Sequence, residues 1–90
     1  MIMRVLFKFY GNLMNYFGEK ASIEVEEGVT VQEALMKLKL VDGTPAYASI
    51  FVNTHLQMFI VFVSGKHADL NTRLKGENVE VTVLPPIMGG

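Results

Sequence analysis

Three stretches of this chain alternate apolar and polar residues, and this alternation limits the possible folds more than any other feature. The apolar positions are Val5, Phe7 and Phe9 in residues 3–10, Ile23 and Val25 in residues 21–26, and Val79, Val81 and Val83 in residues 79–84. A period of two is typical of a strand with one buried face. Residues 57–64 are dense in β-branched and aromatic side chains, which predicts a fourth strand buried on at least one face and favours burial on both.

Between the second and third of these strands lies one clear helix signal. Thr30 at the N-cap and Glu33 three residues later match the S/T-x-x-E capping box. The residues that follow at helical spacing are Val31, Ala34, Leu35 and Leu38, with Lys37 and Lys39 near the expected end. The order strand, strand, helix, strand, strand predicts an α+β fold in which one main helix packs across a mixed sheet.

The segments between these elements carry weaker signals. Residues 13–17 are apolar and predict a packed loop within a hairpin of the first two strands, and turns are expected at 11–12, 64–66 and 76–78. Thr44 and Pro45 could begin a short second helix that runs to about Phe51. Pro85-Pro86 ends the last strand, because proline lacks the N–H that a sheet needs. We therefore expect a domain over residues 1–84 and an extended, flexible tail over residues 85–90.

Length and charge exclude several classes of protein. Ninety residues correspond to one small domain, and the absence of cysteine rules out disulfides and cysteine-ligated metals. Eight basic and nine acidic residues give no positive excess for binding nucleic acid. The longest apolar run, residues 58–63, is far shorter than the roughly 20 residues that span a membrane. Arg4 and Lys8 interrupt the apolar start, so no signal peptide is expected and a cytoplasmic protein fits best.

Side chains offer little chemistry. No catalytic triad order, phosphate-binding loop or cluster of metal ligands is present, and we expect His55 and His67 to be ordinary surface residues. The acidic side chains Glu24, Glu26 and Glu27 are expected to face solvent. What remains is the terminal pair Gly89-Gly90, which alone would also suit a frayed end. A tip without Cβ atoms on a stiff Pro85-Pro86 stem suits insertion into a crowded active site of another protein.

These features together carry a resemblance to a known family. The segments concerned are Val5-Leu6-Phe7, Val29 to Leu35, Leu74 to Val79, and the ending Leu84-Pro85-Pro86-Ile87-Met88-Gly89-Gly90. They resemble the MoaD/ThiS family of ubiquitin-like, β-grasp sulfur carriers, most of all the MoaD-type small subunit of molybdopterin synthase. The ending P-P-x-x-G-G is the most specific part, and residues 42–55 match least.

The resemblance implies a function in molybdenum or tungsten cofactor biosynthesis. An E1-like enzyme would use ATP and Mg²⁺ to adenylate Gly90, and a sulfur donor protein would convert the adenylate to a thiocarboxylate. The tail Pro85, Pro86, Ile87, Met88 and Gly89 would thread into partners, including the large subunit of molybdopterin synthase. The chain itself would bind no cofactor or metal and supply no catalytic side chain. A protein modifier joined to lysines through Gly90, a thiamine-pathway carrier and a non-catalytic binding module stay open as alternatives.

A carrier also needs a surface that its partners grip. First and last strands are neighbours in β-grasp folds, so the predicted alternation turns Leu6, Tyr10, Thr82 and Leu84 to the face away from the helix. These side chains could form an exposed apolar patch beside the tail. The alternative is that Leu6 and Leu84 are scattered surface residues of no special role. Lys8, in the same strand as Leu6, falls where related carriers often have an apolar residue.

Overall fold

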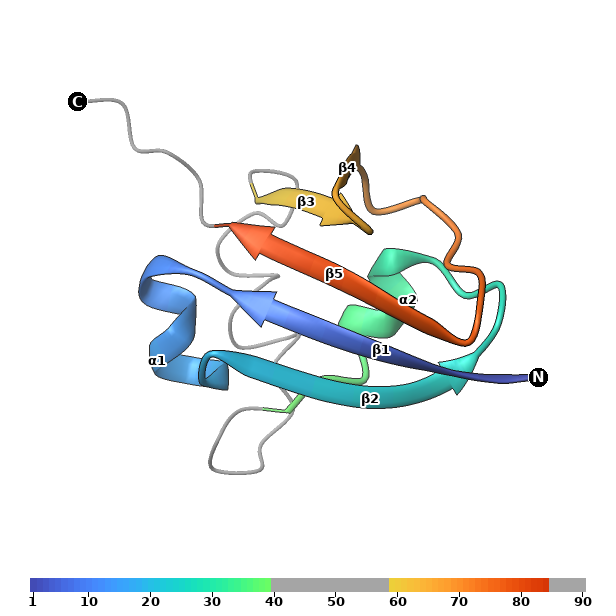
Figure 1. Cartoon of the computed structure of the whole chain (residues 1–90). Helices are drawn as coiled ribbons and strands as arrows, with labels where there is room; N and C mark the ends of the chain where they lie inside the picture. The colour runs from blue at the N-terminus through green and yellow to red at the C-terminus, as the bar shows by residue number, and fades with distance from the viewer. Residues whose placement is uncertain (40–58, 85–90) are drawn as a thin grey trace.

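The first and last strands of the chain lie side by side in the middle of one sheet. A computed structural model describes residues 1–39 and 59–84. Its elements are β1 (Ile2–Phe9), the 3₁₀ helix η1 (Gly11–Leu13), α1 (Met14–Phe17), β2 (Lys20–Glu26), α2 (Val31–Leu35), β3 (Ile60–Val63), β4 (Lys66–Ala68) and β5 (Asn78–Leu84). The strand order is β2-β1-β5-β3-β4 (Figure 1). β1 pairs with β5 in parallel, and the other three neighbouring pairs are antiparallel.

The core lies between the sheet and α2, which covers one face (Figure 1). The predicted apolar positions of β1 and β5 are all buried there, and Val25 of β2 joins them. Ile23 is only partly buried, because β2 is an edge strand of the described sheet. The predicted α+β class, with one main helix packed across a mixed sheet, is confirmed.

α2 begins where the capping box places it but ends sooner than the apolar spacing predicts. Thr30 and Glu33 exchange the expected hydrogen bonds. The α-helix ends at Leu35, and the N–H groups of Lys37 and Leu38 donate to carbonyls only three residues back. Leu38 is still buried, since this tighter turn keeps it over the core. Lys37 and Lys39 therefore follow the α-helix instead of forming its last turn.

The link between β1 and β2 is helical, whereas an irregular loop was predicted. η1 and α1 occupy residues 11–17, and the predicted packing is confirmed because Leu13 and Phe17 are buried. The ring of Phe17 stacks on that of Phe9, with centroids 4.4 Å apart. Gly18 then turns the chain into β2 with a φ of +81°, a backbone conformation that favours glycine.

A two-residue turn at Ser64-Gly65 confirms the predicted reversal and leads into a strand, β4, that was not predicted. In β3 Val61 is buried, which confirms burial of at least one face. Ile60 and Phe62 on the other face are partly exposed, so the favoured burial of both faces is wrong. The predicted turn near Gly76 is confirmed, with β5 starting at Asn78. The possible helix at residues 44–51, positions 57–58 of the fourth strand and the tail 85–90 lie outside the described residues.

The segment before β5 fastens the start of α2 to the rest of the domain. Backbone hydrogen bonds run from Val31 N–H to the Thr72 carbonyl and from Leu74 N–H to the Val29 carbonyl, at 2.9 and 2.8 Å. The guanidinium of Arg73 donates to the Gly28 carbonyl at 2.8 Å. Leu74 is fully buried beneath these contacts. Hydrogen bonds with residues 72–74 thus attach the N-terminal end of α2 to the segment that leads into β5.

Candidate partner-docking surface

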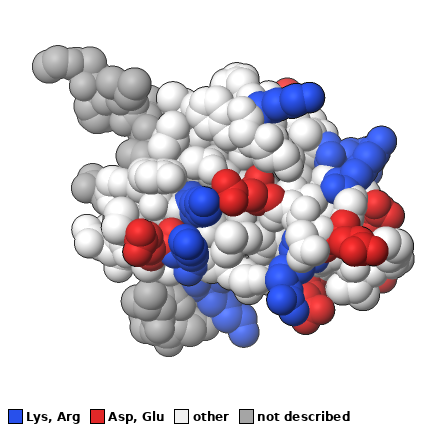
Figure 2. Space-filling model, viewed as in Figure 1, with Lys and Arg blue, Asp and Glu red and all other residues white. Residues whose placement is uncertain are grey.

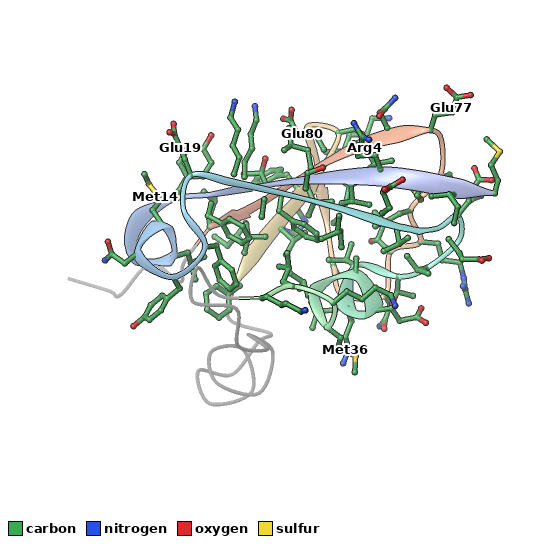
Figure 3. All side chains as sticks on the ribbon, turned by 90° about the horizontal axis from the view of Figure 1, so that it is seen from below. Arg4, Met14, Glu19, Met36, Glu77 and Glu80 are labelled. Atoms are coloured by element: carbon green, nitrogen blue, oxygen red, sulfur yellow. The ribbon has the colours of Figure 1, made fainter. Side chains whose placement is uncertain are left out.

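The face of the sheet that α2 does not cover, called the outer face below, carries the second set of alternating side chains. Figure 3 shows Arg4 and Glu80 pointing away from the sheet on this side, while Met36 lies on the helical side. In the parallel register of β1 and β5, Leu6 lies beside Glu80 and Lys8 beside Thr82. The alternation along each strand therefore determines which residues a partner could touch.

The apolar side chains of the outer face gather over β3 and the end of β5. Ile60 is the register partner of Leu84, and Phe62 is that of Thr82. All four side chains are partly exposed. The imidazole of His67 in β4 meets the Phe62 ring edge-on, with centroids 5.7 Å apart. We call Ile60, Phe62, Thr82 and Leu84 the apolar patch.

The four residues predicted to form a docking patch are not one continuous group. Thr82 and Leu84 lie in the apolar patch, whereas Leu6 lies beside Glu80 and lines a separate shallow hollow of about 380 Å³. The other residues lining that hollow are Arg4, Ser22, Asn78, Val79 and Glu80. Tyr10, 48% exposed, lines a second hollow of about 470 Å³. Its other lining residues are Lys8, Phe9, Met14, Glu19 and Lys20.

A surface ion pair separates Leu6 from the apolar patch. Lys8 Nζ lies 3.2 Å from Glu80 Oε2, and the two side chains are 30% and 46% exposed. Figure 2 shows this mixture of basic and acidic groups over the middle of the outer face, with white side chains above it toward β3. A pair this exposed contributes roughly 0–1 kcal/mol to stability. Its larger effect is to give the middle of the face a polar character.

Phe62 and Ile60 are surface residues that the sequence did not predict. The sequence predicted burial of residues 57–64 on at least one face and favoured both, and it did not select any of their side chains as outward-facing. The alternation Ile60, Phe62 against Val61, Val63 contains the necessary signal. Choosing which pair faces outward requires the pairing of β3 with β5, and that pairing joins residues distant in sequence.

In the part of the chain that the structure describes, His67 and the acidic side chains form no second candidate site. His67, Glu24, Glu26 and Glu27 are exposed, and Glu27 Oε2 accepts a hydrogen bond from the Gly76 N–H at 2.9 Å. His55 lies outside the described residues. Residues 1–39 and 59–84 contain no group of three potential metal ligands. No helix in these two ranges is long and apolar enough to cross a membrane.

The end of β5 belongs to the apolar patch and directly precedes, in the sequence, the tail predicted over residues 85–90. β5 ends at Leu84, a member of the apolar patch, and Pro85 is the next residue in the sequence. Pro85, Pro86, Ile87, Met88, Gly89 and Gly90 themselves lie outside the described residues. The apolar patch therefore extends to the last residue of the chain that the structure describes.

Comparisons with known proteins agree on the type of chain. The sequence model of the ThiS family matches residues 7–90. The small archaeal modifier protein 1 (SAMP1) of Methanosarcina acetivorans has a similar structure, with a TM-score of 0.71, 22% identity, and coverage of 100% of this chain and 99% of that one. SAMP1 of Haloferax volcanii gives 0.66 and 18%, covering 97% and 99%. A putative molybdopterin converting factor subunit 1 of Pyrococcus furiosus gives 0.64 and 17%, covering 94% and 99%.

At these identities the structural matches establish the fold, which confirms the predicted β-grasp class. No curated protein matches the chain.

Proposed function

The chain belongs to the ThiS family, and on that premise we propose that it carries sulfur as a thiocarboxylate on Gly90. The observation that carries the proposal is the family match itself, which runs to residue 90 and includes the Gly89-Gly90 ending. The apolar patch supports it, because partly exposed apolar side chains at the end of β5 would give a partner protein a contact next to the tail. The chemistry would then take place on the main-chain carboxylate of the last residue.

The reaction needs two displacements, both in the active sites of partner proteins. A Gly90 carboxylate oxygen attacks the α-phosphorus of Mg²⁺-ATP, and the bond to pyrophosphate breaks. A sulfide equivalent from a sulfur donor protein then attacks the acyl carbon, and AMP leaves with the bonding electron pair. A carboxylate is a poor electrophile, so exchange of oxygen for sulfur requires this activation. The E1-like enzyme supplies it, and this chain contributes its tail and its outer face.

We assign the sulfur to molybdopterin synthesis, with this chain as the small, sulfur-donating subunit beside a large synthase subunit in the cytoplasm. Two observations favour this pathway over thiamine synthesis. The Pyrococcus furiosus structure of the same fold bears the name molybdopterin converting factor subunit 1. The Pro85-Pro86 stem also resembles MoaD-type carriers more than carriers of the thiamine pathway.

A second candidate function is conjugation to lysines of other proteins through Gly90. The SAMP1 structures favour it, because their name describes modifiers and their fold spans nearly this whole chain. Both functions use the same adenylate and differ in the nucleophile that attacks it. A search of a lysate for lysines that carry a Gly-Gly remnant, after chemical cleavage on the carboxyl side of methionine, separates them, because Met88 precedes Gly89.

Intact mass spectrometry tests the proposal directly. Incubation of the chain with ATP, Mg²⁺, a cognate activating enzyme and a sulfur source should add the mass difference between one sulfur and one oxygen atom. A variant that lacks Gly90 should fold normally and show no change. An unchanged mass of the intact chain, with an activating enzyme shown to be active on its own carrier, would refute the proposal.

The apolar patch can be tested with two substitutions in the same strand and on the same face. Leu84→Asp puts a charge into the patch and should raise the KM for the activating enzyme roughly tenfold or more, since loss of a central apolar contact costs on the order of 1–2 kcal/mol. Asn78→Asp adds the same charge at the far end of β5, where the side chain is exposed, and should leave KM unchanged. Equal effects of the two would contradict a role for the patch.

A further inference from the structure

β2 is a seven-residue edge strand that, within the described residues, has β1 as its sole neighbour in the sheet. Which backbone groups face outward follows from its pairing with β1. The Phe9 N–H donates to the Glu19 carbonyl at 3.1 Å, and the Glu27 N–H donates to the Met1 carbonyl at 2.9 Å. In an antiparallel ladder hydrogen-bonded positions alternate, so the odd-numbered residues of β2 bond β1. The even-numbered residues from Lys20 to Glu26 direct their N–H and C=O groups to the other edge of β2, where no strand of the described residues lies.

A second copy of β2 can form hydrogen bonds with these N–H and C=O groups in only a few antiparallel registers. Antiparallel pairing of two identical strands requires even-numbered residues opposite even-numbered ones. With the two-fold axis at Ile23, Lys20 lies opposite Glu26 of the second copy, and Ser22 lies opposite Glu24. With the axis at Glu24, two carboxylates would face each other, which is unfavourable. With the axis at Ser22, Glu26 would extend beyond the second copy's strand, so only the Ile23 register pairs all seven residues.

The side chains on both faces suit the Ile23 register. On the outer face, the Lys20 ammonium of each copy lies opposite the Glu26 carboxylate of the other copy. This charge pair therefore occurs twice, once at each end of the paired strands. Glu24 meets Ser22 of the second copy and lies opposite Arg4 in its own sheet. On the inner face Ala21 and Ile23 are only partly buried in the single chain. The pairing would set Ile23 against Ile23 and Ala21 against Val25, which would cover this remaining apolar surface.

We propose that two copies of this chain associate through their β2 edges, with Ile23 on the two-fold axis, into one continuous ten-stranded sheet. The pairing uses the edge opposite β3 and β4 in the strand order β2-β1-β5-β3-β4. The apolar patch and the end of β5 therefore stay accessible, and the two ends of β5 lie at opposite ends of the dimer. The inference rests on β2 alone and does not depend on the proposed sulfur chemistry.

Single cysteines report the register, because the natural chain has none. Ile23 opposite Ile23 is a pair without mutual hydrogen bonds, for which Cα atoms lie about 4.5 Å apart, within the range that a disulfide spans. Ile23→Cys should therefore give a covalent dimer under mild oxidation. Ser22→Cys and Glu24→Cys are matched controls whose cross-linking would indicate the two other registers. Cross-linking that is no faster for Ile23→Cys than for the controls would overturn the proposal.

A charge exchange tests the same contact without any covalent bond. Sedimentation of the full chain over a concentration series should show a monomer–dimer equilibrium. Lys20→Glu and Glu26→Lys alone should each raise the dissociation constant about tenfold or more, since each places like charges opposite at two points. The double variant should restore the wild-type value, which neither other register predicts. A wild-type chain that stays monomeric at all concentrations, or a double variant without rescue, would overturn the proposal.

Discussion

Thr30 and Glu33 fix the start of α2 through reciprocal hydrogen bonds. The Glu33 N–H donates to Thr30 Oγ1 at 3.1 Å, and the Thr30 N–H donates to Glu33 Oε1 at 2.9 Å. The Thr30 hydroxyl also donates to Glu33 Oε1, at 3.1 Å. The bond from the Thr30 N–H, and after it the bond from the Thr30 hydroxyl, lower the pKa of the Glu33 carboxyl below its ordinary value. A five-residue helix depends on such local contacts, because it has few hydrogen bonds of its own.

Removal of the cap should weaken the whole domain measurably. Thr30→Ala leaves the Glu33 N–H without its acceptor, and a lost N-cap side chain costs about 1 kcal/mol of the free energy of unfolding. Urea titration followed by circular dichroism checks this value. Thr30→Ser keeps the hydroxyl and should recover most of the loss. A Thr30→Ser variant as unstable as Thr30→Ala would mean that packing of the threonine methyl group, not capping, is responsible.

The lowered pKa of Glu33 predicts a pH dependence of stability with a definite sign. A folded-state pKa below the unfolded value means that the charged form stabilises the fold, so the contribution is complete above the unfolded pKa. It is lost as the pH falls through the lower, folded pKa of Glu33. Glu33→Gln removes the titration, so the stability difference between wild type and variant should shrink as the solution is acidified. A difference that stays constant with pH would contradict this assignment.

Among the elements, the β3–β4 hairpin shows most clearly how the backbone conformation of a turn limits the residues that fit it. Ser64 and Gly65 both have positive φ, at 51° and 83°, and they join strands paired from Val63 to Lys66. Two such residues in a two-residue hairpin loop are typical of a type I′ turn, in which Asn-Gly is preferred. Serine is therefore the less suited of the two residues in this turn.

Replacement of that serine should stabilise the hairpin. Ser64→Asn introduces a residue that tolerates the left-handed region better and should raise the free energy of unfolding by about 0.5 kcal/mol. Gly65→Ala should lower it by roughly 1–2 kcal/mol through backbone conformation alone. Apart from its own residue and the two chain neighbours, a Cβ there would have no atom within 4 Å, so contacts with the rest of the fold do not contribute. Thermal and urea unfolding of the two variants measure both changes. If both variants were as stable as the wild type, backbone strain at this turn would be ruled out.

The same hairpin marks how far the sequence predicts the fold. Alternation was sufficient for β1, β2 and β5, because each places an apolar residue on the core at every second position. β4 has three residues, Lys66 to Ala68, and is a strand only because β3 lies beside it. The outward position of Phe62 depends on the same long-range pairing. Of the docking surface, Thr82 and Leu84 were therefore predictable from their own strand, whereas Ile60 and Phe62 were not.

At the scale of the whole molecule, one apolar core joins β1 to β5, the first and last strands of the described residues. All fully buried side chains in the described residues are hydrophobic, and the rings of Phe7, Phe9 and Phe17 stack in sequence within that core. Phe17 comes from the short α1, so this stacking joins the β1–β2 connection to the sheet. A small domain has about 5–15 kcal/mol of stability in total, so one large aromatic side chain is a considerable part of it.

Truncation of this ring should destabilise the entire domain in one transition. Phe17→Ala should lower the free energy of unfolding by about 3–5 kcal/mol, because it leaves a cavity against Phe9. Tyr16→Ala removes the adjacent aromatic ring, which is 44% exposed, and should change stability by roughly 0.5 kcal/mol or less. Calorimetry of the two variants provides the comparison. A Phe17→Ala variant with nearly wild-type stability would show that α1 is dispensable for the core.

The parallel pairing of β1 with β5 has a kinetic consequence. It joins Arg4 to Asn78, so nearly the whole chain must be closed into a loop before the two central strands meet. Proteins whose contacts join distant residues fold slowly, within milliseconds to seconds. The local β1–β2 hairpin can form earlier. Its apolar face, with Val5, Phe7 and Ile23, then stays exposed to solvent until β5 and α2 pack against it. At high protein concentration, partly folded chains would aggregate most readily during that interval, through the exposed apolar face of the β1–β2 hairpin.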